Sequence, residues 1–580
     1  MKKFFWLFLL VAGLSLAASV RAQNTWLNSP DGDFRWTSVN WTAPTTWAGG
    51  DDAIFGPNGV GPVSISSPVT AHNLTFNSPG YAITNGTLTL NGATPTITVN
   101  ENASISSIIT GGSGLTLLGL SSLTLLGANT YTDGTYVRSG TLILRSAGVN
   151  GSTTYSVERI QSIDPGARVE IGTLNDGSDL DGATSNIRPP DGQLQRGGST
   201  GRLNLTGGTF DNKGDNNGIN YPPPEGTGTI INSSPYQRAV LKISKSDGAT
   251  YVFNGQIMDG GVTISKTNGG PGYQQSVDMN GGNFKMIWGG SNSFSGFIRM
   301  NSGPTGNTII LTNQGTLGYP APINCPARHI LMNSGTIDLN GTSQKVGYVY
   351  TGNDANSKIV NSTLGTVSTL TVGFNCTNLV PFNGAATPRG IRSALLDDPT
   401  NGGTLALTKE GVCIQPLGNY SGDGTPAPNN YHGDTTVNNG ILQVLSLGGI
   451  SPNSHYRLNT TSGTLQLSYS GIAPVKALSI NGVALVNGVY GSSTAPITGP
   501  GFVRVTGNPA LRITEVNYDV GADGLVLRWD SVPGAIYAIQ NSQNLVDWDS
   551  LTTGISSGGV TTTNKIDFPQ PGTFYRIRKD

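Results

Sequence analysis

The chain has 580 residues, and its composition excludes several classes of protein. Lysine and arginine (33 residues) almost balance aspartate and glutamate (34 residues), so the formal net charge is −1. This balance argues against nucleic acid or an anionic membrane surface as the main partner, because both select a basic protein face. Glycine, with 82 residues, is about twice as frequent as its usual share of roughly 7%. No apolar run keeps a period near 3.6 residues over several turns, so we expect no long helices.

Residues 1–22 have the pattern of a signal peptide. Lys2 and Lys3 form a positive region, Phe4–Leu16 form an apolar stretch, and Val20-Arg21-Ala22 resemble a signal-peptidase site. We therefore expect export and a mature chain that begins at Gln23. The apolar stretch is shorter than the roughly 20 residues of an ordinary membrane span, and no later segment is apolar enough to cross a membrane as a helix.

Residues 23–60 are predicted to cap the first turn of an elongated fold. They contain four of the eight tryptophans of the chain, Trp26, Trp36, Trp41 and Trp47. The alternative is a platform of exposed tryptophans that stack against sugars. Packing is favoured, because large aromatic side chains bury much apolar area and usually serve the core. A cap also keeps the first strand edges from pairing with other chains.

Residues 61–508 contain a phrase that occurs twice and a degraded third time. The two clear versions lie at residues 114–144 and 403–444, about 300 residues apart, and the third lies at 284–296. Such self-similarity indicates a repeat architecture, in which each unit buries its apolar face by stacking on its neighbours. Segments such as Leu115–Leu126 and Ala239–Ile243 show the alternation of half-buried strands. The sequence therefore predicts an all-β stack.

The repeats resemble the autotransporter-associated β-strand repeat. The match is carried by residues 123–125 with 128–132 and by residues 419–422 with 435–437. Similar accompanying stretches occur at 334–341, 368–373 and 480–491, so the resemblance extends over most of residues 26–507. It implies a right-handed parallel β-solenoid (β-helix) on the surface of a bacterium, and it implies no reaction. At about 4.8 Å per rung, some 20 rungs would form a rod on the order of 100 Å long.

An asparagine close to a tyrosine occurs in both clear versions, as Asn129 with Tyr131 and as Asn419 with Tyr420. We expect the two asparagines to occupy corresponding turns, where a side-chain amide can satisfy backbone groups. We expect the tyrosine rings to pack close by.

Within residues 151–280 the solenoid is predicted to continue, interrupted by two long polar segments. These segments, 186–201 and 216–228, contain prolines, and long loops often carry function. Tyr221, which precedes three prolines, is a candidate for binding a partner.

Residues 509–580 read as a small antiparallel β-sandwich. Alternating stretches at 526–529, 537–540 and 573–578 are separated by turns. The pattern resembles the immunoglobulin- or fibronectin-type-III-like modules that end many secreted proteins of the Verrucomicrobia and related bacteria. Trp529 is the expected core tryptophan.

No catalytic residues are predicted. The histidines, His72, His329, His432 and His455, show no metal-binding spacing. Two acidic groups deserve a test, Asp397 with Asp398, and Asp176 with Asp179 and Asp181. A solvated loop is the favoured interpretation of both, because charged residues are mostly exposed. Neighbouring residues of a strand also point to opposite faces, which makes Asp397 and Asp398 a poor catalytic pair.

Two further features leave alternatives open. Residues 175–182 combine several oxygen ligands with glycine, which suits calcium, but they lack the full spacing of a calcium loop, so an Asx-rich turn is favoured over a metal site. Cys325, Cys376 and Cys413 allow one disulfide and one free thiol, and the sequence does not show which residues pair. No cofactor is predicted.

The function favoured by the sequence is that of a secreted or cell-surface structural or adhesive repeat protein without catalysis. Extracellular polysaccharide or other cell-surface components are the expected partners. The alternatives are a carbohydrate-active β-helix enzyme, whose acidic residues would come from successive rungs, and a non-catalytic glycan-binding protein.

Overall fold

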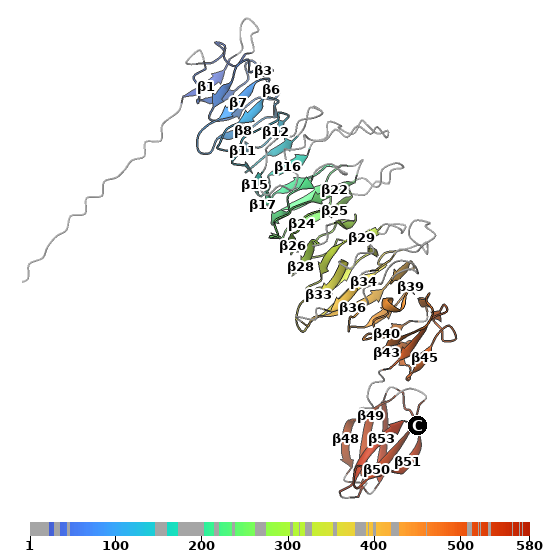
Figure 1. The fold of residues 1–580 in the computed structure, drawn as a ribbon. Coiled ribbons are helices and arrows are strands. Elements are labelled where there is room, and N and C mark those ends of the chain that lie inside the picture. Colours follow the sequence, from blue (N-terminus) through green and yellow to red (C-terminus); the bar gives the residue numbers. More distant parts are fainter. Residues whose placement is uncertain are drawn as a thin grey trace, which may run out of the picture.

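The chain folds into a long stack of parallel strands followed by a smaller antiparallel unit (Figure 1). This computed structural model confirms the all-β solenoid and the antiparallel strands at the C-terminal end. Among the described residues the helical content is one short 3₁₀ turn, η2 (Leu447–Gly449), and no helix there is long and apolar enough to cross a membrane. The described residues are 22–579 without the segments 28–34, 43–46, 145–158, 172–201, 214–219, 235–237, 262–273, 302–305, 319–327, 352–356, 377–389, 398–401, 419–428, 507–512, 522–523 and 532–534 and the single positions 313, 393, 460, 520, 560, 568 and 571.

The longest sheet has fifteen strands, and every two neighbouring strands in it are parallel. With neighbouring strands 4.7–4.9 Å apart, this sheet alone extends over about 65–70 Å. Its strands, in spatial order, are β1 (Gln23–Trp26), β2 (Asp52–Phe55), β5 (Leu74–Phe76), β8 (Thr96–Val99), β11 (Leu115–Gly119), β13 (Thr135–Val137), β15 (Arg159–Ile163), β17 (Arg202–Leu205), β20 (Pro224–Gly226), β23 (Thr250–Phe253), β26 (Lys285–Trp288), β28 (Thr308–Leu311), β30 (Gly335–Asp338), β33 (Ser357–Asn361) and β35 (Ala394–Asp397).

Three further parallel sheets form the other faces of this part of the solenoid. The first contains β4 (Val69–Ala71), β7 (Thr87–Leu90) and β10 (Ile108–Thr110). The second contains β3 (Pro62–Ser64), β6 (Tyr81–Thr84), β9 (Ala103–Ile105), β12 (Ser122–Leu125), β14 (Thr141–Leu144), β16 (Arg168–Ile171), β18 (Thr209–Asp211), β21 (Thr229–Asn232) and β24 (Gln256–Asp259). The third contains β19 (Asn220–Tyr221), β22 (Ala239–Ile243), β25 (Gln275–Asn280), β27 (Ile298–Asn301), β29 (Arg328–Met332) and β32 (Tyr348–Thr351).

The solenoid continues through three more sheets. The first contains β31 (Gln344–Lys345), β34 (Val367–Val372), β36 (Thr404–Lys409), β38 (Thr435–Val437), β40 (His455–Leu458), β43 (Ala477–Ile480) and β44 (Val483–Ala484). The second contains β37 (Ile414–Leu417), β39 (Gly440–Val444), β41 (Gly463–Leu467) and β46 (Ile497–Thr498). The third contains β42 (Ile472–Val475), β47 (Phe502–Val505) and β45 (Gly488–Tyr490).

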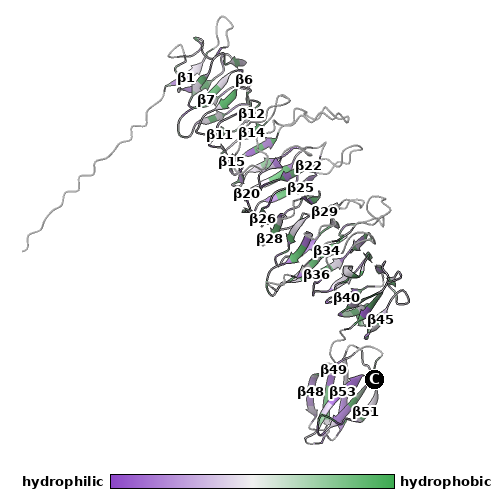
Figure 2. Ribbon diagram, viewed as in Figure 1, coloured by the Kyte–Doolittle hydropathy of each residue, from purple (hydrophilic) through white to green (hydrophobic). Residues whose placement is uncertain are grey.

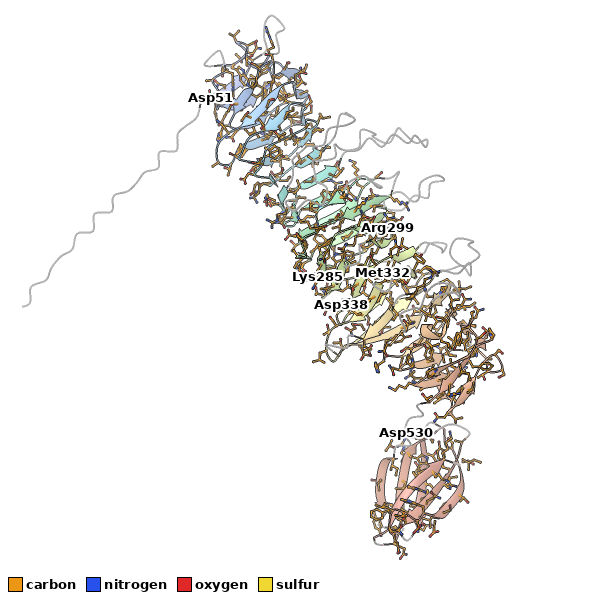
Figure 3. The ribbon with its side chains drawn as sticks, viewed as in Figure 1. Asp51, Lys285, Arg299, Met332, Asp338 and Asp530 are labelled. Carbon is orange, nitrogen blue, oxygen red and sulfur yellow. The ribbon has the colours of Figure 1, made fainter. Side chains whose placement is uncertain are left out.

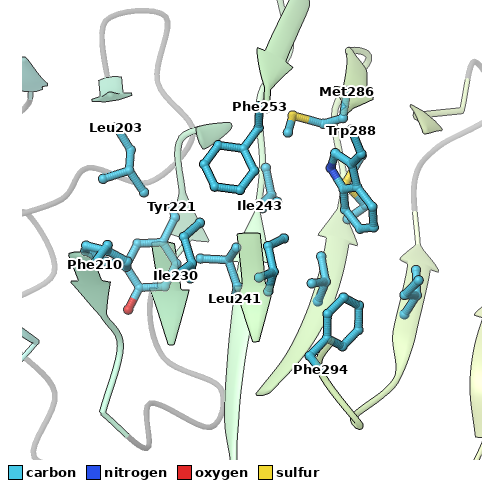
Figure 4. Packing of buried hydrophobic residues seen from close by; sticks show 14 of the residues in the cluster. Leu203, Phe210, Tyr221, Ile230, Leu241, Ile243, Phe253, Met286, Trp288 and Phe294 are labelled. Carbon is cyan, nitrogen blue, oxygen red and sulfur yellow. The ribbon is translucent and has the colours of Figure 1, made fainter. Parts of the chain in front are cut away.

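The period-2 alternation of each strand produces the core. Leu74 pairs in register with Ile97, and Leu117 pairs with both Ile97 and Val137, so four fully buried side chains form one column. Such stacking keeps apolar residues inside and threonine, serine and asparagine outside. Figure 4 shows at close range buried hydrophobic side chains of a later part of the core, from Leu203 to Phe294, and Figure 2 shows hydrophobic and hydrophilic residues interspersed along the solenoid.

The N-terminal tryptophans pack against one another and against the first rungs. Trp26, Trp36 and Trp41 are at most 1% exposed, and the rings of Trp26 and Trp41 meet edge to face with centroids 5.2 Å apart. Phe55 lies in the same cluster and stacks on Phe76 of the next rung at 4.8 Å. These rings are therefore core residues, and the alternative of an exposed sugar platform does not hold for them.

The last rungs are closed by strands that reverse direction. Asn481 and Gly482 have positive φ angles of 49° and 81°, which a two-residue hairpin requires, and they turn β43 into the antiparallel β44. β45 then pairs antiparallel with β47, which is the last parallel strand of that sheet. Two free edges are covered in this way, which limits pairing with other chains.

In its two clear versions, the repeated phrase forms a buried turn with the same two contacts, an asparagine that accepts a backbone N–H and a pair of hydroxyl groups. Asn129 Oδ1 accepts the Ile109 backbone N–H at 2.8 Å, and the Tyr131 hydroxyl lies 2.7 Å from Thr135 Oγ1. The same contacts recur 300 residues later. Asn429 Oδ1 accepts the Leu395 N–H at 2.9 Å, and the hydroxyls of Tyr431 and Thr435 are 2.6 Å apart.

This geometry corrects the expected alignment of the repeats. Asn419 and Tyr420, which the sequence aligned with Asn129 and Tyr131, lie outside the described residues, and Asn429 and Tyr431 make the equivalent bonds. Asn and Tyr are separated by one residue in both versions. Eleven residues lie between Leu417 and Asn429, whereas three lie between Leu125 and Asn129, so the second version carries an insertion of eight residues.

The third version keeps the asparagine and replaces the hydroxyl pair. Asn292 Oδ1 accepts the Ile257 N–H at 2.8 Å, as in the other turns. Phe294 and Ile298 occupy the positions of the tyrosine and the threonine, and both are fully buried. Tyrosine hydroxyl and threonine hydroxyl are thus lost together, which avoids an unsatisfied buried polar group.

The C-terminal unit consists of two three-stranded antiparallel sheets. One contains β48 (Ile513–Asp519), β49 (Gly524–Asp530) and β52 (Thr561–Asp567), and the other contains β51 (Asp549–Ser556), β50 (Ile536–Ser542) and β53 (Phe574–Lys579). Trp529 is fully buried between them and meets Tyr537 at a centroid distance of 5.8 Å. This confirms Trp529 as a core residue.

Replacing Asn429 by Ala should destabilise the solenoid more than replacing Asn129. Asn429 also donates from Nδ2 to the Gly449 carbonyl at 2.9 Å, whereas the buried Nδ2 of Asn129 has no partner. We expect a difference of about 1 kcal/mol in the free energy of unfolding, measured by urea denaturation. Equal losses for the two variants would contradict this assignment.

The hydroxyl pair Tyr131–Thr135 predicts non-additive substitutions. Thr135→Val leaves the buried tyrosine hydroxyl without a partner and should cost about 1–3 kcal/mol. Adding Tyr131→Phe should restore most of that loss, because the double variant matches the natural pair Phe294 and Ile298. A double-mutant cycle from denaturation curves measures the coupling, and strictly additive losses would refute it.

Candidate functional site

Asp397, a residue singled out from the sequence, lies at the end of β35 and contacts His432. Asp397 Oδ1 accepts the Leu405 N–H at 2.8 Å, and Oδ2 accepts the His432 N–H at 3.1 Å. Oδ2 also lies 2.6 Å from His432 Nδ1. The histidine side chain is 56% exposed and the aspartate side chain 16%. The carboxylate therefore orients an exposed imidazole, whose Nε2 remains for water or a ligand.

Further polar side chains continue from this contact across β38, β40 and β43. Asp434 forms an ion pair with Arg457 at 2.6 Å, and His455 Nε2 lies 3.0 Å from Ser479 Oγ. Burial lowers the pKa of His455, and the positive charge of Arg457 lowers it further. We call Asp397, His432, Asp434, His455 and Arg457 the polar strip. Sequence reasoning named Asp397 and missed the strip, because its members come from three separate segments between residues 397 and 457.

The polar strip suits hydrogen bonding better than acid–base catalysis. Glycoside hydrolysis needs two carboxyl groups placed on either side of one bond. Here Asp397 already accepts three hydrogen bonds, and Asp434 is paired with Arg457. Within the described part of the chain, no group of three or more His, Cys, Asp and Glu residues is placed to bind a metal ion.

The most buried carboxylates of the solenoid are also structural. Asp211 and Asp278 are fully buried and form ion pairs with Arg168 and Arg299, respectively. Asp338 accepts the Ser362 N–H at 3.1 Å and the Ser362 hydroxyl at 2.6 Å, which joins two rungs. Figure 3 shows labelled charged residues, among them Asp51, Lys285, Arg299 and Asp338, at different places along the rod. These charged residues thus lie at different places along the solenoid and do not form one cluster.

Several predicted site residues lie outside the described residues. They are Asp176, Asp179, Asp181 and Asp398, the side chain of His329, and the whole of segments 175–182 and 186–201. The calcium interpretation of residues 175–182 therefore stays a prediction. Tyr221, by contrast, is described and fully buried, with its ring 5.5 Å from that of Phe210. It packs in the core and is not displayed beside the prolines.

The cysteines divide into one bonded and one free residue where they are described. Cys376 takes part in a disulfide, and Cys413 is a free thiol that is 2% exposed. Cys325 lies outside the described residues. Burial raises the pKa of the Cys413 thiol, which disfavours the reactive thiolate.

Lys409 is a buried cation next to this thiol. It ends β36, is fully buried, and donates from Nζ to the carbonyls of Glu410, Gly411 and Asn439 at 2.6, 2.8 and 3.1 Å. Three carbonyl oxygens thus replace water around the ammonium, and they join two rungs. Burial nevertheless lowers the pKa of Lys409 to about 8.

In the comparison with known proteins, the chain is similar to the adhesin BmaC autotransporter of Brucella suis biovar 1 (strain 1330). The two sequences are 27% identical over 448 residues. The chain is distantly related to an autotransporter sequence. The aligned part covers 74% of this chain and 12% of the adhesin, so the chain spans only a small part of that protein. No family model and no solved structure matches the chain.

The buried Lys409 predicts a pH-dependent stability. Its pKa is near 8 in the folded chain and 10.5 when unperturbed, so between these values the unfolded chain binds more protons. Stability attributable to Lys409 should therefore rise with pH across this window, by up to about 3 kcal/mol.

Urea denaturation from pH 7 to 10.5 checks this against the variant Lys409→Met. Both chains keep Cys413, whose raised pKa lowers stability as the pH rises; because Lys409 lowers the pKa of Cys413, this loss is larger in the variant and adds to the expected difference. The stability of the natural chain relative to the variant should increase with pH. A constant difference would mean that Lys409 does not titrate in this range.

Proposed function

We propose that this chain is an exported structural or adhesive protein that works at the cell surface or after secretion. The observation that carries the proposal is the similarity of 448 residues to an autotransporter adhesin, which coincides with a continuous parallel solenoid. The long apolar core leaves outer faces made largely of threonine, serine and asparagine. A rod of this kind suits display, spacing and contact, and extracellular polysaccharide or other cell-surface components are the partners we propose.

Several features support the absence of catalysis in this proposal. Several of the described carboxylates, Asp397 and Asp278 among them, are held by backbone N–H groups or by arginines. General acid–base chemistry needs titratable groups within hydrogen-bond reach of one substrate bond. Of the described histidines, only His432 has a side chain that is more than half exposed.

A second candidate function is non-catalytic glycan binding at the polar strip. An oriented, exposed imidazole next to Asp434 and Arg457 offers donors and acceptors to sugar hydroxyls. Trp41 and Tyr221 are not suitable binding residues, because both are buried. A glycan site on the described surface would depend on His432 in their place.

Display of the chain on a non-adherent bacterium tests the adhesive proposal. We expect attachment to at least one member of a panel of polysaccharide-coated surfaces, measured by retained cells after washing. Cells that display an unrelated protein of similar size are the control. Attachment no greater than the control on every surface would refute adhesion.

Assays on the purified chain distinguish the structural or adhesive function from catalysis and from glycan binding. We expect no release of reducing or unsaturated sugars from a broad polysaccharide panel. Turnover that disappears in Asp397→Asn, or in Asp176→Asn, Asp179→Asn or Asp181→Asn, would establish the enzyme instead. Binding without turnover that is lost in His432→Ala, with an unchanged melting curve and with His72→Ala as the matched control, would favour the glycan-binding function.

A further inference from the structure

Among the strands that the structure describes, two edges on the same side of the C-terminal sandwich have no further partner strand. Each of its sheets has three strands, in the orders β48-β49-β52 and β51-β50-β53. Only residues 557–560 connect β51 to β52, so these two edges lie together on one side of the sandwich. β48 and β53 are then the edges of the other side. Among the described strands, each of them pairs with one neighbour, β48 with β49 and β53 with β50.

The core-facing side of β48 is exposed. Val516 pairs with Leu527 and Ile513 pairs with Trp529, and paired residues of antiparallel strands point to the same face. Leu527 and Trp529 are at most 2% exposed, whereas Val516 is 57% exposed and Ile513 is 36% exposed. Tyr518, on the same face, is 55% exposed. The apolar side chains of β48 thus point to the core side of their sheet, but the opposite sheet does not cover them.

The two edges carry opposite charges on their outer faces. On β48 the outward residues, which alternate with the inward apolar side chains, are Glu515, Asn517 and Asp519, and all three are exposed. On β53 the outward residues are Phe574, Arg576 and Arg578, and the inward residue Ile577 is 9% exposed. One edge is therefore acidic and the other basic. The inner side of β48 is apolar, and the inner side of β53 carries Ile577 between Tyr575 and Lys579.

We propose that two copies of this chain pair through these edges, with β48 of each copy added to β53 of the other. The outer faces then bring Glu515 and Asp519 of one copy beside Arg576 and Arg578 of the other. The inner faces bring Val516 against the Ile577 side of the sheet, which extends the core. Because both contacts form at once around a two-fold axis, the assembly closes as a dimer.

The charges select this pairing over the alternatives. Two β48 edges would place acidic residues side by side, and two β53 edges would place arginines side by side, and like charges on adjacent strands are destabilising. Backbone pairing at an open sheet edge supplies affinity, while alternating side chains supply specificity. An exposed apolar edge that meets its complement is also protected from unspecific pairing.

Two charge-reversed full-length variants test the proposal. Glu515→Lys with Asp519→Lys makes both edges basic, and Arg576→Glu with Arg578→Glu makes both edges acidic. Each variant alone should be monomeric at concentrations where the natural chain is a dimer, a weakening of at least about tenfold. An equimolar mixture should recover the dimer as a heterodimer, because each basic edge then meets an acidic edge.

Analytical ultracentrifugation and light scattering measure the stoichiometry, and the melting curve of each variant checks its fold. Val516→Lys should also weaken the dimer, whereas Thr563→Lys on the outer edge strand β52 should leave it unchanged. A natural chain that stays monomeric up to high micromolar concentration overturns the proposal. A dimer that persists in both reversed variants, or variants that do not recover association on mixing, overturns it as well.

Discussion

Parallel pairing between successive rungs is the constraint on which this structure depends. Each inner strand of the fifteen-stranded sheet bonds to one rung before it and one after it, so no rung is stable by itself. The backbone groups at the two ends of the stack would remain open without additional elements. The aromatic cluster around Trp26 and Trp41 covers the first rungs, and the antiparallel strands β44 and β45 cover the last. The most unusual local structures therefore lie at the two ends of the solenoid.

Buried polar side chains keep the rungs in register. Asn129, Asn292 and Asn429 each accept a backbone N–H from another rung, and Lys409 contacts carbonyls of two rungs. Buried carboxylates such as Asp211 and Asp278 are matched by arginines on neighbouring strands. In a fold with many equivalent strands, a shift by one rung would leave these groups unsatisfied at a cost of about 1–3 kcal/mol each. The polar interior therefore gives specificity to a core that is otherwise repetitive.

This use of polar groups also bears on function. Asp397, a charged residue that the sequence singled out, joins segments of the solenoid, because its carboxylate accepts the Leu405 and His432 backbone N–H groups. What the outer faces offer is length and hydrogen-bonding capacity, which fit contact with a surface better than turnover. The sandwich differs from the solenoid, because its edges β48 and β53 are uncovered and oppositely charged.

The sequence by itself determined the fold class and much of the core. Alternation and self-similarity are local properties, so the parallel stack, the packed tryptophans and the buried Trp529 could be predicted from residue patterns. The correspondence of Asn429 with Asn129 could not be predicted from the sequence. An insertion moves the equivalent residues, and the pair Asn419-Tyr420, which looks more similar, precedes them. Only the tertiary structure decided which polar residues meet, since Asp397 reaches His432 across 35 positions and Asp278 reaches Arg299 across 21. Contacts between rungs depend on how many residues each turn contains, and that number varies along this chain, so sequence spacing does not reveal them.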